Sequence, residues 1–188
     1  MLIASVLGNI KALLQSAKIV EARDGAILIS ESSRTARLRG VCIDSVGSTA
    51  FAIRFDQCGF PGNKLFADHA TMHRACDAIV FCSLGETAYI LCCELKSSLP
   101  DRKEARDQFF SAACFLDCLE CILSQYSQGN SIKTWKRRYF VFHDQGATPM
   151  QKRTSVKTKI NDLPETAEMR ATQDNGKFYL RALVNEAI

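Results

Sequence analysis

The sequence predicts an α/β fold in which a central mixed β-sheet is flanked by helices. Two amphipathic helical patterns, at the start and near the middle of the chain, alternate with short runs of β-branched and aromatic residues. Hydrophobic residues make up 47% of the 188 residues and charged residues 23%, an ordinary balance for a globular protein. No apolar run reaches the roughly 20 residues of a membrane-spanning helix. We therefore expect a single domain over residues 1–188 that makes no membrane contact.

The first predicted element is an amphipathic helix over Met1–Val20. Its apolar residues recur at three- and four-residue steps and so share one stripe: Leu2, Ile3, Val6, Leu7, Ile10, Leu13, Leu14 and Ala17. The segment has neither the basic leader nor the small-residue cleavage site of a signal peptide. The nine cysteines are an odd number, which argues against a secreted disulfide scaffold. A reducing, cytoplasmic compartment is expected.

Strands and a second helix follow. Runs of apolar, β-branched and aromatic residues predict strands at Ala26–Ser30, Val41–Ile43, Ala50–Asp56, Cys76–Ser83 and Thr87–Lys96, with a loop at Gly59–Asn63. A helix is predicted from Ser98, as N-cap, to about Gln125, ended by Gly129-Asn130. Its expected buried face consists of Ala105, Phe109, Ala112, Leu116, Leu119 and Leu123. Trp135–Phe142 and Lys177–Val184 complete the predicted strands.

Two of these strands are predicted to form a hairpin. Gly85-Glu86 separates them, and glycine first in a two-residue loop suits a type II′ turn. In that register Phe81 faces Ile90 and Asp77 faces Glu94, with directly opposite Cβ atoms about 4.5–5.5 Å apart. A bulge would shift the pairing by one residue. Without one, two carboxylates lie side by side at the end of an apolar hairpin.

These carboxylates predict a metal site. Like charges opposite each other destabilise a sheet, and a divalent cation is the simplest way to offset them. Lys96 is two residues beyond Glu94 and projects from the same face. Carboxylate oxygens favour Mg²⁺ or Mn²⁺, which can polarise a phosphoryl oxygen, while the ammonium can orient an attacking water. A surface salt bridge of Lys96 with Glu94 or Asp77 is the alternative.

This pattern resembles the PD-(D/E)xK nuclease superfamily, whose fold is restriction-endonuclease-like. Asp77 matches the acid at the start of one core strand, and Glu94-Leu95-Lys96 matches the Glu-x-Lys of the next. The resemblance covers roughly Met1 to Phe142 and implies the order helix, strands, helix, strand. It assigns catalysis to Asp77, Glu94 and Lys96, and metal binding to Asp77, Glu94 and the Leu95 carbonyl.

The resemblance also implies supporting residues and marks two departures. Gln108 matches a family position on the following helix. Cys76 replaces the usual proline, and Met1–Val20 has no acid where many members carry a glutamate. Glu31, or else Glu21, is the expected substitute. If neither reaches the metal, the site holds a single ion or has decayed.

Basic residues predict a nucleic-acid partner. Eight basic residues and one acid lie within 131–160, although the whole chain has a net charge of only +4. The expected nucleic-acid contacts are Arg102, Arg106, Lys136, Arg138, Lys152 and Arg153. On a strand, Lys136 and Arg138 share one face, while Trp135, Arg137 and Tyr139 share the other. A solvated basic surface is an equal alternative for this stretch, and a flexible loop for 145–158.

The other potential sites are weaker. Cys114, Cys118 and Cys121 recur at helical spacing, but no second cysteine pair completes a zinc site. These three are expected to be buried, as are Cys82, Cys92 and Cys93 on the hairpin. The histidines are His69, His73 and His143, of which His73 could lie near the carboxylates.

The expected function is that of a Mg²⁺- or Mn²⁺-dependent nuclease, an endonuclease or exonuclease that hydrolyses phosphodiesters in DNA, with RNA as the other possible substrate. The family resemblance implies a role in defence against foreign DNA or in DNA repair. Cutting both strands would require a homodimer or a partner subunit. The alternative is a catalytically degenerate module of the same fold that binds nucleic acid or serves in assembly.

Overall fold

The structure, a computed structural model, describes residues 3–14, 16–31, 33, 35–57, 74–127, 130–144 and 161–184. Its α-helices are α1 (Ile3–Leu13), α2 (Arg102–Tyr126) and α3 (Leu180–Val184). Its strands are β1 (Ile19–Glu21), β2 (Ala26–Ser30), β3 (Gly40–Asp44), β4 (Phe51–Arg54), β5 (Ala78–Leu84), β6 (Thr87–Lys96), β7 (Lys136–Asp144), β8 (Glu168–Thr172) and β9 (Gly176–Tyr179). Short 3₁₀ turns occupy Ser16–Lys18, Phe55–Gln57 and Pro164–Thr166.

The larger sheet is mixed, as expected. Its order is β1-β4-β5-β6-β7-β8, antiparallel from β1 to β6 and parallel from β6 to β8. A helix-containing crossover between β6 and β7 permits the parallel pairing, because α2 carries the chain back along the sheet. The predicted α/β class with a mixed sheet flanked by helices is therefore confirmed.

The β5–β6 hairpin has the predicted register. Phe81 pairs with Ile90, and the ladder continues without a bulge to Ala78 and Cys93. Gly85 has a φ of +59°, as the first position of a type II′ turn requires, and Glu86 is not among the residues with positive φ. The turn therefore fixes the register, and with it which side chains of β5 and β6 share each face.

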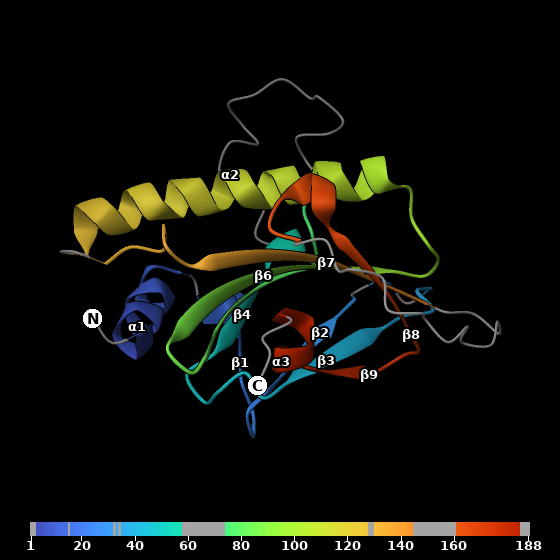
Figure 1. Ribbon diagram of the computed structural model, residues 1–188, viewed down its shortest axis with the longest axis horizontal. Coiled ribbons are helices and arrows are strands. Elements are labelled where there is room, and N and C mark those ends of the chain that lie inside the picture. Colours follow the sequence, from blue (N-terminus) through green and yellow to red (C-terminus); the bar gives the residue numbers. More distant parts are fainter. Residues whose placement is uncertain are drawn as a thin grey trace.

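Both faces of this sheet are covered, in three layers (Figure 1). Alternate strand residues form two separate cores, since successive side chains point to opposite faces. Phe51, Ile79 and Ile90 belong to the core shared with α1 and α2. Ala52, Val80 and Leu91 belong to the core shared with α3 and a second sheet of order β2-β3-β9. The carboxyl end of β6 lies between these layers.

The long helix α2 follows the predicted stripe but begins later. Its buried residues are the six expected ones. The N-cap is Asp101, whose side chain accepts from the Lys103 N–H, so the prediction of Ser98 as cap was wrong. Among the described helices, only α2 is long and apolar enough to cross a membrane, a criterion that core helices meet as well.

Two other element predictions need correction. The first helix ends at Leu13 rather than near Val20, and Ile19–Glu21 then forms β1. Lys177–Val184 is not one strand: β9 ends at Tyr179, and α3 begins at Leu180. Leu180, Leu183 and Val184 are buried at helical spacing, which is the physical reason for the helix. Neither β1 nor β8 was predicted.

The helix cysteines were wrongly expected in the core. Cys114, Cys118 and Cys121 are exposed, whereas Cys76, Cys82, Cys92 and Cys93 are buried. The buried stripe of α2 passes through Ala112 and Leu116, and Cys114 lies two residues from each, about 200° around the helix. Several predictions fall outside the described residues: those for Gly59–Asn63, His69, His73, Gly129, Lys152, Arg153 and the loop 145–158.

Candidate functional site

Asp77, Glu94 and Lys96 come together at one end of the large sheet. Asp77 directly precedes β5, and Glu94 and Lys96 end β6. Glu94 continues the alternation of Ile90 and Cys92, so it faces α2. It is only 3% exposed, an unusual position for a carboxylate. The sequence pattern thus placed three charged groups at one location beneath α2.

Backbone hydrogen bonds hold the two carboxylates. The Asp77 N–H donates to Glu94 Oε2 at 3.2 Å, and the Leu95 N–H donates to Asp77 Oδ2 at 2.5 Å. Each carboxylate therefore accepts a hydrogen bond from a backbone N–H of the other segment. The Asp77 carbonyl in turn accepts from the Phe55 N–H at 3.0 Å, which ties the site to the end of β4.

Side chains from α2 complete the arrangement. Lys96 Nζ lies 2.9 Å from Glu94 Oε1 and 3.0 Å from Glu104 Oε1. Gln108 Nε2 donates to Glu94 Oε1 at 2.6 Å, while Gln108 Oε1 is buried without a partner. Glu104 and Gln108 are four residues apart and so share one side of the helix. The structure thus brings the expected Gln108 onto the expected Glu94.

Burial dominates the electrostatics of the pair. It raises the pKa of Asp77, and the neighbouring Glu94 charge raises it further. Burial also raises the pKa of Glu94, although Lys96 and Gln108 act in the opposite direction. Burial lowers the pKa of Lys96, but the Glu94 and Glu104 carboxylates outweigh that effect and raise it. Two acids that resist ionisation thus lie beside a firmly protonated amine.

Glu31, rather than Glu21, belongs near this cluster. The charges of Glu31 and Asp56 both raise the pKa of Asp77, so both acids lie within electrostatic reach of it. Burial raises the pKa of Asp56, and Glu31 adds to that rise. Glu21 instead pairs with Lys11 at 2.6 Å on an exposed surface.

The expected nucleic-acid contacts are spread over separate surfaces. Arg102 is exposed at the start of α2, and Arg106 lies 3.5 Å from Asp107. At helical spacing, Arg106 and Gln108 lie on opposite flanks of the buried stripe of α2. Lys136 and Arg138 pair with Tyr89 and Leu91 and share their face of the sheet, the face away from α2. These two basic residues are therefore not brought to the carboxylates.

Three neighbours of the site were not singled out from sequence. Glu104 contacts Lys96, and Asp56 acts electrostatically on Asp77. His143 pairs with Lys96 in the parallel β6–β7 register. Its Nδ1 lies 3.2 Å from the Asp144 carbonyl, which can only accept, so that nitrogen carries the proton. The sequence signal for Glu104 was its four-residue step to Gln108. Asp56 follows β4, which pairs with β5, and His143 lies on β7, which pairs with β6; no local pattern specified these pairings.

Asp77 and Glu94 are the oxygen donors that the site offers to a metal ion. In the described part of the chain, no three His, Cys, Asp or Glu side chains form a group that could hold a metal ion. Mg²⁺ is nevertheless commonly held by one or two carboxylates together with water and substrate phosphate. Asp77 and Glu94 supply two hard oxygen donors whose charges are costly to bury. Their chemistry fits such an ion.

Comparisons with known proteins add no relative. No protein-family model, curated protein or solved structure matches this chain.

Proposed function

We propose that this chain is a metal-dependent nuclease that hydrolyses phosphodiester bonds in DNA. The observation that carries the proposal is the convergence of Asp77, Glu94 and Lys96 on one face, with Gln108 donating to Glu94. Two buried acids beside an amine suit the handling of a phosphate and an attacking water. A defence or repair role in a reducing cytoplasm, and a homodimer or a partner subunit for double-strand cutting, remain parts of the proposal.

The element order supports a restriction-endonuclease-like core. A helix, an antiparallel β4-β5-β6 unit, a helix and a parallel β7 follow one another along the chain. Strands β1, β2 and β3 are inserted between the first helix and this unit. The resemblance implies the order helix, strands, helix, strand, and this chain has that order.

Each residue of the site has a proposed task. Asp77 and Glu94, with the Leu95 carbonyl, would hold Mg²⁺ or Mn²⁺, and Glu31 is the candidate for a third acid. The bound ion would polarise the scissile phosphate and lower the pKa of its water. Lys96 is kept protonated by its acidic neighbours and orients the attacking water. Gln108 holds the Glu94 carboxylate in place through its 2.6 Å hydrogen bond.

One observation favours the second candidate, a degenerate module that binds nucleic acid without cutting it. Both Glu94 oxygens already accept hydrogen bonds, from Asp77 N–H and from Gln108, and Lys96 lies against one of them. A metal would have to share these oxygens or displace Lys96. Binding of DNA without cleavage would support this second candidate.

A plasmid-nicking assay with Mg²⁺ or Mn²⁺ separates the two. We expect the unmodified chain to nick plasmid DNA, and Glu94→Ala and Lys96→Ala to reduce the rate at least about a hundredfold, the scale of losing a transition-state contact. Glu165→Gln, at an exposed carboxylate on another segment, is the control and should retain full activity. Equal rates for Glu94→Ala and the unmodified chain would contradict the nuclease proposal.

A further inference from the structure

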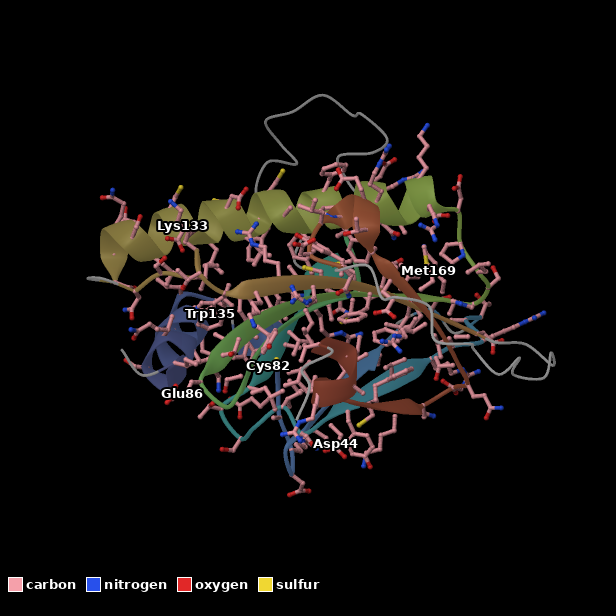
Figure 2. All side chains as sticks on the ribbon, viewed as in Figure 1. Asp44, Cys82, Glu86, Lys133, Trp135 and Met169 are labelled. Carbon is pink, nitrogen blue, oxygen red and sulfur yellow. The ribbon has the colours of Figure 1, made fainter. Side chains whose placement is uncertain are left out.

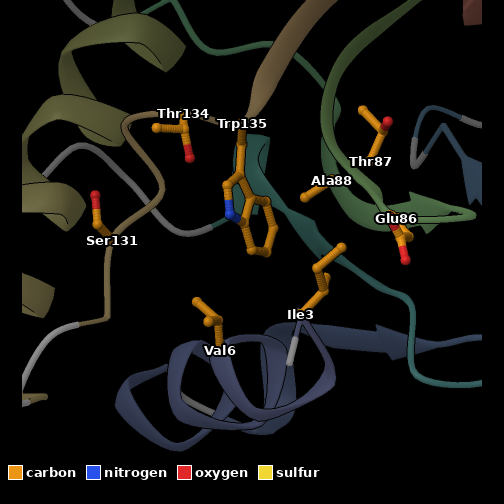
Figure 3. A pocket seen from close by; sticks show the side chains of 8 residues that line it. All are labelled: Ile3, Val6, Glu86, Thr87, Ala88, Ser131, Thr134 and Trp135. Carbon is orange, nitrogen blue, oxygen red and sulfur yellow. The ribbon is translucent and has the colours of Figure 1, made fainter. Parts of the chain in front are cut away.

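A pocket lies at the opposite end of the large sheet from the candidate site. It measures about 340 Å³ and is lined by α1, the β5–β6 turn and the segment leading into β7. Figure 3 shows Trp135 at its centre, with Ile3 and Val6 on one side and Glu86 on another. Glu86 and Glu94 are eight residues apart, about 26 Å along a strand. The pocket is therefore separate from the carboxylate cluster.

Figure 2 places the two sites relative to each other. Met169 on β8 pairs with Val141 on β7, which in turn pairs with Glu94 on β6. Met169 therefore lies at the same level along the strands as the candidate site. Met169 is labelled well away from Glu86 and Trp135 along the molecule. A ligand in the pocket would not touch the groups proposed for catalysis.

The floor of the pocket is apolar. Val6, Ala88 and Trp135 are each at most 9% exposed, and they pack in the same core. The Trp135 ring is held edge-on against Phe81, with the ring centroids 6.5 Å apart. A rigid indole face and aliphatic walls favour a flat hydrocarbon or aromatic group. The volume is within the range of small-molecule sites, about 300–1,000 Å³.

The rim is polar and carries one charge. Glu86 is exposed and, within the described residues, has no ion-pair partner. Hydroxyl groups come from Thr87, Ser131 and Thr134, and none of the described residues that line the pocket is a lysine or arginine. An indole face and a lone carboxylate both attract cations. The same carboxylate repels phosphates and carboxylates, so nucleotides fit this pocket poorly.

We propose that this pocket binds a small organic cation, an amine whose protonated nitrogen faces Glu86 and whose aromatic or hydrocarbon body lies against Trp135. Charge complementarity selects the ammonium, and the apolar floor selects the body. The proposal does not depend on the nuclease proposal, because it uses none of the same residues.

Fluorescence of the full chain tests the ligand class directly. Trp135 is the only tryptophan, so its emission reports on the pocket alone. We expect 2-phenylethylamine to change this emission saturably and to bind about fivefold more tightly than 2-phenylethanol, the upper end for a partly exposed ion pair. Phenylacetate should bind more weakly than either. No saturable change with the amine, or equal affinity for all three probes, overturns the proposal.

Variants at Glu86 test the assigned charge. Glu86→Gln should bring the affinity for the amine down to that for the alcohol, and Glu86→Lys should reverse the preference toward phenylacetate. Both changes keep a polar side chain at an exposed turn position, and far-UV circular dichroism checks the fold. Glu165→Gln is the matched control and should bind as the unmodified chain does. An amine preference that survives Glu86→Gln overturns the assignment.

Discussion

At the residue scale, the Asp77–Glu94 pair is costly to the fold. Burial raises the pKa of both carboxyl groups above their ordinary values of 3.8 and 4.5. The folded chain therefore holds these protons more tightly than the unfolded chain does. Stability from this source is fully present below about pH 4 and is lost as the pH rises through the raised folded values. Groups kept at such a cost are typical of functional sites.

Asp77→Asn should therefore stabilise the protein at neutral pH. The amide oxygen can still accept from the Leu95 N–H, and folding at neutral pH no longer has to protonate or bury an ionised acid. Each unit of raised pKa corresponds to about 1.4 kcal/mol, and each kcal/mol to about 2–4 °C in melting temperature for a chain of this size. Thermal unfolding at pH 7 and pH 4 measures the effect, and the gain should shrink at pH 4.

The control for this prediction is Glu165→Gln, which removes an exposed carboxylate and should leave the melting temperature unchanged at both values of pH. If the melting temperature of Asp77→Asn at pH 7 is at or below that of the unmodified chain, burial of the Asp77 carboxyl group does not destabilise the fold. The interpretation of the pair as a functional site would then lose its energetic support.

At the element scale, the start of α2 positions Glu104 and Gln108 over the sheet. Asp101 caps the helix by accepting from the Lys103 N–H at 3.1 Å. Asp101→Ala should cost about 1 kcal/mol, or about 2–4 °C in melting temperature, because it leaves a helix N–H without its acceptor. Ser98→Ala, outside the helix, should change stability by less than about 0.5 kcal/mol. A larger loss for Ser98→Ala would contradict the observed cap.

The same region shows what the sequence could and could not decide. Ser98 and Asp101 are both good N-cap residues, but a cap at Ser98 would make Leu99 the first helical residue. Pro100 disfavours helical dihedrals at Leu99, so the sequence itself argued against Ser98 as the N-cap. The hairpin was predicted with its register because a two-residue turn fixes which residues of the two strands lie opposite each other. The three residues of β1 (Ile19–Glu21) gave no such local signal.

At the scale of the whole molecule, strands were predicted at the positions of β2 and β3, but the second sheet that they form with β9 was not, because the β3–β9 pairing is non-local. Val41 on β3 pairs with Gly176 on β9, across most of the chain, and nothing within either segment specifies the other. The candidate site needed only the hairpin and the helix after it, so it was predictable from local patterns. Its links to Asp56 and His143 depend on longer-range pairing and were found only in the structure, whereas Glu31 was already expected from the family resemblance.

The two-sided core predicts which thiols can react. Cys92 and Cys93 are adjacent on β6, yet each is buried, because α2 covers one face and the small sheet the other. Burial also raises the pKa of Cys82 and Cys92 to about 12, which leaves almost no reactive thiolate near neutral pH. Cys114, Cys118 and Cys121 are exposed on the outer side of α2.

Iodoacetamide labelling of the native chain at pH 7.5, mapped by peptide mass spectrometry, should therefore modify the three α2 cysteines and spare Cys82, Cys92 and Cys93. Labelling in denaturant supplies the control, since all six should then react. If Cys92 or Cys93 instead reacts at a rate comparable with Cys118 in the native chain, the face of the sheet on which that cysteine lies is open to solvent. In that case the layer covering that face, and with it the three-layer arrangement around the candidate site, would have to be revised.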